Sequence, residues 1–250
     1  GDDNMNILLC NDDGFDSKGI RLLKEKLSKY GNVYIIAPET AMSAKSCAVT
    51  IGQGMNFIKH LDKIYSFSGT PADCVSFALS TYPIKFDLVV SGCNNGLNVS
   101  YDTMYSGTIG ACLEALIQGK PAIAFSAPSD DLSLVEKYFD DVMDFINENE
   151  LISQHEFFLN VNFPTSKDAK SIRFSRMFMR NDKHFFLKKD DGLYYAGREV
   201  NEECDDKETD VYQVNHSIIS VTPMKGTYFG GHCFRKIVNN VKTKKKTLGH

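Results

Sequence analysis

The sequence predicts an α/β protein in which a doubly wound, mainly parallel sheet carries a C-terminal β-hairpin extension. In the first half of the chain, short apolar runs alternate with segments whose apolar residues recur every three or four positions. That alternation is typical of strands and helices in turn, which build a parallel sheet covered on both faces. After residue 155 the runs are short, rich in Phe and Tyr and separated by turn signals, which indicates β-hairpins. We expect one domain over 5–250, with the hairpin extension at about 170–235.

The first three elements follow from residue patterns. The run "NILLC" (6–10) is apolar throughout, as in a parallel strand that is buried on both faces. The next segment predicts a helix with Ser17 as its N-cap and Gly31 as its end. Its apolar positions at helical spacing are Ile20, Leu23, Leu27 and Tyr30. The run "NVYIIAP" (32–38) is the second buried strand.

Later elements continue the alternation. Pro in the first turn marks a helix over 71–80, and apolar runs predict strands over 86–92 and 121–127. A helix over 107–119 lies between these two strands, and a long amphipathic helix follows at 132–147. The apolar face expected for the 107–119 helix consists of Ile109, Cys112, Leu113, Leu116 and Ile117.

The second half of the chain contains four strand-like runs, "FFLNVNFP", "SIRFSRMFM", "HFFLKK" and "LYYAG". We interpret them as β-hairpins added to the core, with a turn at 190–192 and an acidic surface loop at 201–210. Their aromatic residues offer more apolar area than one small sheet covers, which indicates an interface in a homodimer or homotetramer. These aromatic residues are Phe174, Phe178, Phe185, Phe186, Tyr194 and Tyr195.

Composition excludes several classes of protein. The apolar fraction of 42% is sufficient for a proper core, and the net charge of -4 argues against DNA or RNA as the main partner. The basic run at 242–247 is interpreted as a solvated tail. No apolar run reaches the roughly eighteen residues needed to span a membrane, so no membrane partner is expected. Residues 1–4 precede Met5 and are interpreted as a cloning remnant or a short extension.

The seven cysteines indicate a reducing compartment. They are odd in number and scattered, and none forms a CxxC pair. Most lie within apolar runs, where Cys behaves as a small hydrophobic residue. We therefore expect free thiols and a cytoplasmic location, and no disulfide framework.

Polar loops follow the strands of the first half, at the edge where open α/β sheets bind their ligands. The loop at 91–102 runs directly into "YSGTIG" (105–110), where a helix begins. Free N–H groups and hydroxyls at the N-terminus of a helix are suited to binding a phosphate. The side chains gathered at this edge are Asp12, Asp13, Ser43, Ser46, Asn94, Asn95, Asn98, Asp102, Ser106 and Thr108, with Gly107 between the last two.

Adjacent carboxylates beside a phosphate site imply a cation. Asp12 and Asp13 would repel an anionic substrate unless a metal ion lay between them and the phosphate. All the candidate ligands are oxygens, and the six histidines lie outside these loops. Oxygen ligands favour Mg²⁺ or Mn²⁺ over zinc. Each motif also has a simpler interpretation, because "DDG" is a common turn, "SGT" a common helix cap, and Asn-rich loops often form turns.

Three other classes share parts of this pattern. A response-regulator receiver has an acidic pair after its first strand, but it needs an Asp at the end of a later strand, where this chain has Ser91-Gly92. A phosphatase with an aspartyl nucleophile needs an Asp where this chain has Asn11. A nucleotide-binding module without turnover stays open as an alternative, because Gly-rich loops alone do not distinguish binding from hydrolysis.

The combined motifs resemble the SurE family of stationary-phase survival proteins. The similar stretches are "MNILLCNDDGFDSKGI", "APETAMSAKS", "SGTPADCV", "SGCNNGLN", "YSGTIGACLEA", "LNVNFP" and "TDVYQVNHSIISVTP". The similarity runs from about residue 5 to 225. It differs in two places: Ser100 stands where the family usually has Gly, and "YQVNHSIISV" lacks the usual Gly before its strand.

The resemblance implies a metal-dependent 5′-nucleotidase with a Rossmann-like core that hydrolyses nucleoside monophosphates to nucleoside and phosphate. By motif position, it implies one divalent ion per subunit, with Asp12, Asp13, Ser43 and Asn94 as ligands. It implies phosphate contacts from Asn98 and from the turn formed by Ser106, Gly107 and Thr108. The nucleophile expected is a water activated by the metal and positioned by Asp12 or Asp13. A phosphoenzyme on Ser106 is the lesser alternative, because no neighbouring base is evident in the sequence.

Overall fold

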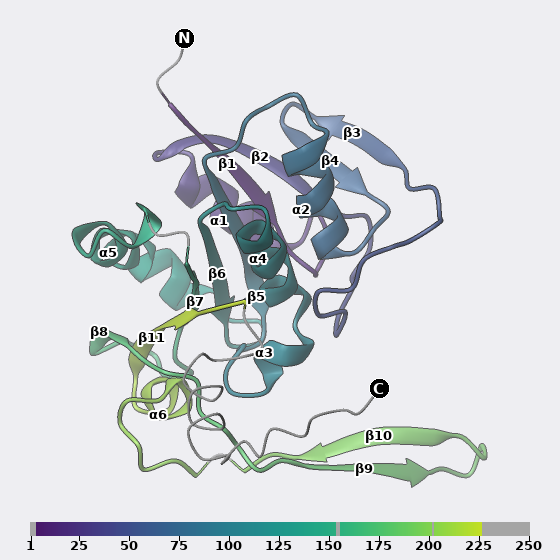
Figure 1. Cartoon of the computed structure of the whole chain (residues 1–250). Coiled ribbons are helices and arrows are strands. Elements are labelled where there is room, and N and C mark those ends of the chain that lie inside the picture. The colour runs from purple at the N-terminus through teal and green to yellow at the C-terminus, as the bar shows by residue number, and fades with distance from the viewer. Residues whose placement is uncertain (1–3, 154–155, 202, 227–250) are drawn as a thin grey trace, which may run out of the picture.

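The computed structural model describes residues 4–153, 156–201 and 203–226. Its centre is a sheet of nine strands in the order β3-β4-β2-β1-β5-β6-β7-β11-β8 (Figure 1). The six strands from β4 to β7 in this order run parallel, β3 and β11 are antiparallel to their neighbours β4 and β7, and β8 is parallel to β11. The predicted doubly wound, mainly parallel α/β fold is confirmed. The basic run at 242–247, residues 1–3 and the end of the proposed hairpin region (227–235) lie outside the described residues.

The strands of the large sheet differ in burial. Those in the middle are buried almost throughout, whereas β3 at one edge is exposed along its whole length. The bounds are β1 Met5–Cys10, β2 Gly31–Pro38, β3 Phe57–Leu61, β4 Ile64–Phe67, β5 Leu88–Asn95, β6 Ala122–Ala127, β7 Phe158–Asn162, β8 Ser171–Phe174 and β11 Ile218–Met224.

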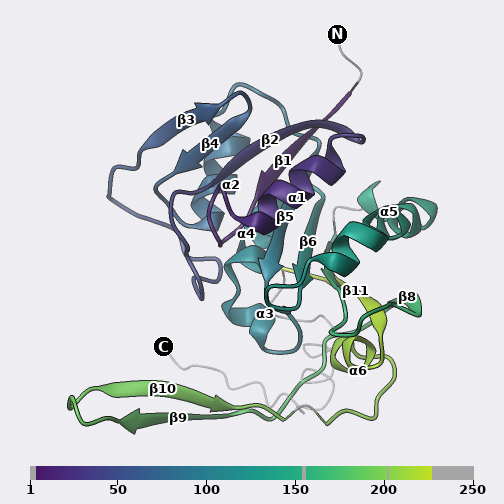
Figure 2. The ribbon, with the colours of Figure 1, turned by 180° about the vertical axis from the view of Figure 1, so that it is seen from behind.

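Helices cover both faces of the sheet. The helices α2 (Pro71–Ser80) and α4 (Gly107–Ile117) pack against each other on one face. The helices α1 (Lys18–Leu27) and α5 (Ser133–Glu148) lie together on the opposite face (Figure 2). The short elements are α3 (Asp102–Tyr105), the 3-10 turn η1 (Leu151–Ser153) and α6 (Asp210–Asn215). Among the residues described, no helix combines the length and the apolar character that crossing a bilayer requires.

Helix α1 ends one turn earlier than predicted. Its N-cap is Ser17, as expected, and the side chain accepts a hydrogen bond from the backbone N–H of Ile20. The helix stops at Leu27, whereas Gly31 is already the first residue of β2. A Cβ on Gly31 would lie 2.1 Å from the carbonyl oxygen of Met5 in β1. Gly31 therefore allows β1 and β2 to pair closely, and the prediction that Gly31 ends the helix was wrong.

Helix α4 buries most of the predicted face and the small residues beside it. Ile109 and Cys112 are buried and Leu113 and Leu116 pack against the core, but Ile117 is 71% exposed. The small residues Gly110, Ala111 and Ala115 are buried as well. A Cβ on Gly110 would lie 1.9 Å from the carbonyl oxygen of Ser46, so the helix and the loop after β2 touch backbone to backbone.

Most of the second half belongs to the large sheet and not to added hairpins. β7 pairs with β6 in parallel, and β11 returns antiparallel on its other side. Within the described residues, only β9 (Lys183–Lys188) and β10 (Tyr194–Glu199) form a separate two-stranded hairpin, which projects away from the body (Figure 1). Phe174 packs on Phe145, so part of the predicted aromatic surface lies on the body of the protein. The prediction of hairpins is confirmed for β9 and β10 and wrong for β7, β8 and β11.

Candidate active site

The polar loops meet in one cleft at the carboxyl edge of the sheet, as the sequence predicts. The cleft has a volume of about 280 Å³. Its walls come from the loop after β1, the loop after β2, the end of β5 with the segment that follows it, the short helix α3, and the N-cap of α4. Its lining residues are Asp12, Asp13, Ser43, Ala44, Asn94, Asn95, Gly96, Leu97, Asn98, Asp102, Tyr105 and Ser106.

The "NDDG" motif is both a turn and part of the site. The Asn11 side chain donates to the carbonyl oxygen of Gly14 at 3.0 Å and to the Ser17 hydroxyl at 2.8 Å. Its Oδ1 accepts from the backbone N–H of Gly14 at 3.2 Å. Gly14 has a φ of 107°, which disfavours any other residue. Asn11 thus holds the turn, and this leaves the two acids that follow it at the cleft.

Asp12 is buried against the start of α4. Its Oδ1 accepts a hydrogen bond of 2.5 Å from the Thr108 hydroxyl. A Cβ on Gly107 would lie 2.8 Å from the Asp12 Cβ and 3.1 Å from its Oδ2. Only glycine leaves room at position 107, and this explains the glycine of the "SGT" turn by its contact with the acid.

Both acids are held in an environment that disfavours their charge. Burial is the main cause that raises the pKa of Asp12, and the neighbouring Asp13 charge raises it further. The Thr108 hydroxyl and the Gly107 backbone N–H act in the opposite direction. Burial also raises the pKa of Asp13, against a hydrogen bond of 3.2 Å from the backbone N–H of Asn95. A positive charge between the carboxylates would relieve both effects.

Asn94 and Ser43 complete the predicted oxygen set. The Asn94 Nδ2 donates to the Gly96 carbonyl oxygen at 2.8 Å, and its Oδ1 lies 3.2 Å from the Thr108 hydroxyl. Ser43 is exposed in the loop after β2 and lines the cleft. That loop is tied to the acids because the backbone N–H of Met42 donates to the Asp12 carbonyl oxygen at 2.7 Å. Strand β5 runs to Asn95, beyond its predicted end at 92, and a register shift between Ser91 and Asn94 accompanies this extension.

The donor chemistry fits a hard divalent cation. The side chains that converge are two carboxylates, an amide oxygen and a hydroxyl, and no Lys or Arg is among the residues that line the cleft. Over the described ranges, no group of three or more His, Cys, Asp or Glu side chains is arranged to hold a metal. A softer ion such as zinc would lack its usual ligands there. The set offers the oxygen ligands that Mg²⁺ and Mn²⁺ prefer.

The two hydroxyls of the phosphate turn have different surroundings: that of Thr108 contacts Asp12, whereas Ser106 lines the cleft. Ser106 caps α4, and its Oγ accepts from the backbone N–H of Ile109 at 3.3 Å, which leaves the hydroxyl hydrogen free to donate. Ser106 lines the cleft. Thr108 is fully buried, and its hydroxyl contacts Asp12 and Asn94. The predicted phosphate contact of Thr108 stays a prediction, because in this structure its hydroxyl supports Asp12.

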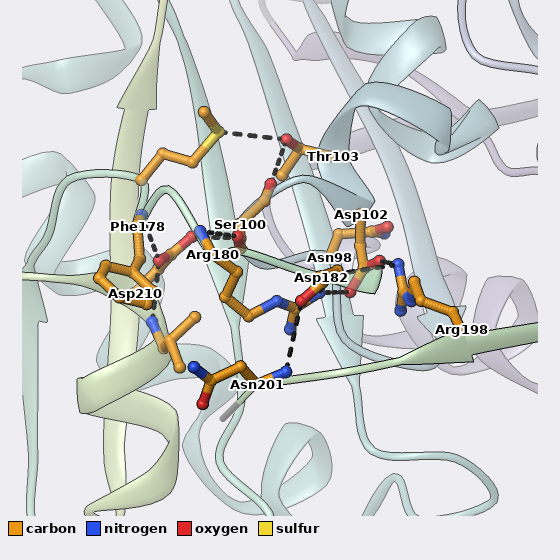
Figure 3. A network of polar contacts seen from close by, with 12 residues as sticks. Asn98, Ser100, Asp102, Thr103, Phe178, Arg180, Asp182, Arg198, Asn201 and Asp210 are labelled. Atoms are coloured by element: carbon orange, nitrogen blue, oxygen red, sulfur yellow. Dashed lines mark hydrogen bonds and ion pairs between the residues drawn. The ribbon is translucent and has the colours of Figure 1, made fainter. Parts of the chain in front are cut away.

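A charged network behind the cleft was not predicted (Figure 3). The buried Arg180 guanidinium binds Asp102 at 2.9 Å and Asp182 at 3.0 Å, and Arg198 of β10 also pairs with Asp102. Asp102 lines the cleft, so this network joins the cleft wall to the hairpin. No periodic pattern in the sequence marks such residues, because they lie in loops, at the start of the short helix α3 and near the end of β10.

The sequence analysis placed Asp210 wrongly. The segment 201–210 was predicted as a surface loop, but Asp210 is fully buried. Its carboxylate accepts from the backbone N–H groups of Ser100 and Phe178, each at 2.8 Å. It is the first residue of α6, and its main-chain partners come from the cleft loop and from the stretch before the hairpin.

Fold and site together define a class: doubly wound α/β proteins with an acidic, oxygen-lined cleft beside a helix N-terminus at the carboxyl edge of the sheet. The family model described as "Survival protein SurE" matches residues 7–184. The chain belongs to the SurE family.

Similar proteins agree with this family. A protein of Clostridium botulinum strain 657 named 5′-nucleotidase SurE is 34% identical over 238 residues, which cover 88% of this chain and 92% of that protein. A 5′-nucleotidase SurE of Clostridium beijerinckii is also 34% identical over 236 residues, with the same coverage of both chains. The crystal structure of the SurE protein from Aquifex aeolicus superimposes with a TM-score of 0.78 at 29% identity, over 94% of this chain and 98% of that one.

Proposed function

We propose that this protein is a divalent-metal-dependent 5′-nucleotidase that hydrolyses nucleoside monophosphates to nucleoside and phosphate. The observation that carries the proposal is the pairing of two adjacent carboxylates, one buried and one half-buried, with a helix N-terminus in a cleft lined by no basic side chain. An anionic phosphate ester is compatible with those acids only when a cation lies between them. The names of the Clostridium relatives support the same activity.

Asp12, Asp13, Ser43 and Asn94 would hold one Mg²⁺ or Mn²⁺ ion per subunit. When bound, the ion would supply positive charge to the phosphate oxygens and lower the pKa of a water. The Thr108 hydroxyl lowers the pKa of Asp12 and so favours its ionised form. Asp13 is only half-buried and faces the cleft, so its carboxylate is suited to orient the attacking water.

The start of α4 and Asn98 would bind the phosphoryl group. The Ser106 hydroxyl has a free hydrogen to donate, and charge grows on the phosphate oxygens during the reaction. A phosphoenzyme on Ser106 is disfavoured, because its hydroxyl accepts a hydrogen bond from a backbone N–H and not from a basic side chain. A nucleotide-binding module without turnover is the alternative, and measurement of phosphate release separates the two.

The test is a phosphatase assay over a panel of nucleoside monophosphates and other phosphate esters, with Mn²⁺, with Mg²⁺ and after dialysis against EDTA. We expect release of phosphate from 5′-nucleotides that is lost with EDTA and restored by either metal. The Asp13→Asn variant should lose most of its affinity for Mn²⁺ in calorimetry while it keeps its fold. Full activity after removal of metal, or unchanged Mn²⁺ affinity in the variant, would contradict the metal assignment.

The proposal extends to assembly and location. We propose that the chain forms a homodimer or homotetramer through the β9–β10 hairpin, where Phe186 and Tyr194 are 68% and 66% exposed. We also propose a cytoplasmic location, because the six cysteines within the described residues are free thiols and four of them are buried.

A further inference from the structure

Buried polar side chains line one face of the sheet beneath the cleft. Residues two apart in a strand face the same side, and β7 alternates the polar Asn160 and Asn162 with the apolar Leu159 and Val161. The strand registers extend the polar positions sideways onto β6 and β11. The members of this stripe are Ser126, Asn160, Asn162, Ser220 and Thr222, and all are buried. Buried amides are costly unless they are hydrogen-bonded, so their partners indicate what they do.

The two asparagines bind the main chain of Asn98. The Asn162 Oδ1 accepts from the backbone N–H of Asn98 at 2.8 Å, and its Nδ2 donates to the Asn98 carbonyl oxygen at 3.0 Å. The Asn160 Nδ2 donates to the same carbonyl oxygen at 2.8 Å. From β6, the Ser126 hydroxyl accepts from the Asn98 side chain at 2.9 Å. Asn98 itself is 4% exposed and lines the cleft.

The side chains of Asn160 and Asn162 take the place of a neighbouring strand for the main chain of Asn98. Asn98 lies beyond the end of β5, so its backbone N–H and C=O have no strand ladder to join, and leaving both unpaired in the interior would be costly. A carboxamide can donate and accept at once through two different atoms, which an ionised Asp or a Leu at position 162 could not do. Both main-chain groups of Asn98 are bound by side chains of β7. This strand therefore fixes the direction in which the Asn98 side chain extends.

We infer that Asn162, supported by Asn160, is a positioning residue that aims Asn98 at the phosphate of the substrate. The inference rests on the proposed function, in which Asn98 contacts that phosphate. It assigns a task to the "LNVNFP" motif, which the metal site and the phosphate turn do not use. It also adds the carboxyl end of β7, where Asn162 is the last residue, to the strand ends that build the site.

The first test compares three variants with a matched control. Asn162→Ala removes the donor and the acceptor, Asn162→Asp keeps the shape but removes the donor, and Asn160→Ala removes one of two donors to the Asn98 carbonyl. Thr222→Val is the control, because Thr222 is buried in the same stripe and its hydroxyl contacts Ser175 and Ser220, not Asn98. KM and kcat for a nucleoside monophosphate, the inhibition constant of inorganic phosphate and the melting temperature are measured for each.

We expect Asn162→Ala to weaken inhibition by inorganic phosphate by up to about a hundredfold, the scale of loss for a misplaced contact group. Asn160→Ala should give a smaller change in the same direction, and Thr222→Val should leave the inhibition constant unchanged while it lowers the melting temperature. A merely structural role predicts similar melting losses with phosphate inhibition unchanged in all variants. That result, obtained with Asn160→Ala even if Asn162→Ala does not fold, would overturn the inference.

A double-mutant cycle isolates the link to Asn98. Asn98→Ala removes the side chain to be aimed but keeps the main-chain groups that Asn160 binds. The effect of Asn160→Ala on phosphate inhibition should therefore disappear in the Asn98→Ala background. Additive effects would overturn the inference. If the wild-type protein neither hydrolyses nucleotides nor binds phosphate, the proposed function fails instead, and this control is measured first.

Discussion

At the scale of single residues, burial disfavours the charged form of both acids in the cleft, and a bound metal ion would relieve that cost. The raised pKa values of Asp12 and Asp13 come mainly from burial. A carboxyl whose pKa is higher in the folded than in the unfolded state stabilises the fold below the unfolded pKa. That stability is lost as the pH rises through the folded pKa. Without metal, the contribution of these two carboxyls to the stability of the fold should therefore be smaller at pH 7 than at mildly acidic pH.

The Asp12→Asn variant tests this conflict between stability and function. Asparagine keeps an oxygen that can accept from Thr108 but carries no charge. Without metal, the variant should melt at a higher temperature than the wild type at pH 7, and the difference should shrink toward pH 4. Added Mn²⁺ should raise the melting temperature of the wild type alone, because ligands stabilise the state that binds them. Differential scanning fluorimetry measures both, and a variant that melts lower at every pH would contradict the account.

Thr108 and Ser106 should differ in their effect on pH dependence. Removing the Thr108 hydroxyl in Thr108→Val takes away a hydrogen bond that lowers the pKa of Asp12, so that pKa should rise further. If Asp12 works ionised, the acid limb of the pH–rate profile should move to higher pH. We expect both Thr108→Val and Ser106→Ala to lower kcat by one to two orders of magnitude, about 1.4–2.8 kcal/mol.

Only the threonine variant should shift the pH profile. Ser106→Ala should also lose about 1 kcal/mol of stability, because it removes the cap of α4. Steady-state kinetics across pH, together with urea unfolding, distinguishes the two roles. Normal kcat in Ser106→Ala with a lowered stability would leave that hydroxyl as a helix cap alone.

At the scale of elements, the charged network fixes the hairpin to the cleft wall through two unequal arginines. The Arg180 side chain is 5% exposed and its partner Asp182 is 2% exposed, whereas Arg198 is 31% exposed. The Nε of Arg180 is buried without a hydrogen-bond partner. Removing one member of a buried pair leaves the remaining charge without compensation, whereas an exposed pair contributes little.

We therefore expect Arg180→Met to cost about 3–5 kcal/mol in urea unfolding. Arg198→Ala should cost less than about 1 kcal/mol, because its pair with Asp102 is partly exposed. The latter change should nevertheless free β10 from the cleft wall and speed proteolysis in the hairpin turn at 189–193. Equal losses of stability from the two variants would contradict this division of roles.

Ser46, Ser100 and Ser217 occupy backbone conformations that favour glycine, and the last two bear on the sequence comparison. Ser100 has a φ of 53° and Ser217, between α6 and β11, has a φ of 64°. These are the places where the sequence departs from the glycines usual in the SurE family. At Ser100 the hydroxyl accepts from the backbone N–H of Arg180 at 3.2 Å, which offsets part of the cost of this conformation.

Ser217→Gly should raise the free energy of unfolding by up to about 1 kcal/mol, because glycine adopts positive φ without the steric cost. Ser217→Ala should give no gain, because alanine retains the Cβ that causes the cost. Ser100→Gly should gain less than Ser217→Gly, since it loses the contact with Arg180. Urea unfolding of the three variants provides the measurement, and a gain from alanine would show that backbone strain is not the cause.

At the scale of the whole molecule, the β9–β10 hairpin extends from the body (Figures 1 and 2), and several of its apolar side chains are exposed. Phe186, Leu187 and Tyr194 are all more than half exposed. We expect light scattering of the wild type at micromolar concentration to give the mass of a dimer or tetramer. Phe186→Ser together with Tyr194→Ser should reduce that mass. Ile51→Ser is the control, because Ile51 is 83% exposed on a loop outside the hairpin. A monomeric wild type would contradict the proposed assembly.

Local patterns were enough to determine the parallel core and the gathering of the polar loops. Helix α2 begins and ends at the predicted residues, because Pro71 marks its first turn and Thr70 forms a capping box with Asp73. Buried parallel strands leave unmistakable apolar runs, and the carboxyl ends of such strands must lie at one edge. The placement of Asp12, Asp13, Ser43, Asn94, Asn98 and Ser106 around one cleft follows from this.

What only the tertiary structure decided depends on contacts between residues far apart in the chain. Exposed β3 and its partner β4 were not predicted, because β3 is an edge strand without the apolar run of a buried one and β4 is only four residues long. The placement of β7, β8 and β11 in the large sheet depends on pairing between residues 36 or more positions apart, which no local pattern specifies. The burial of Asp210, the contacts of Asn162 with Asn98 and the arginine network likewise arise where the two halves of the chain meet. A side chain's partner there is set by packing, whereas its own sequence neighbourhood records only that it is polar.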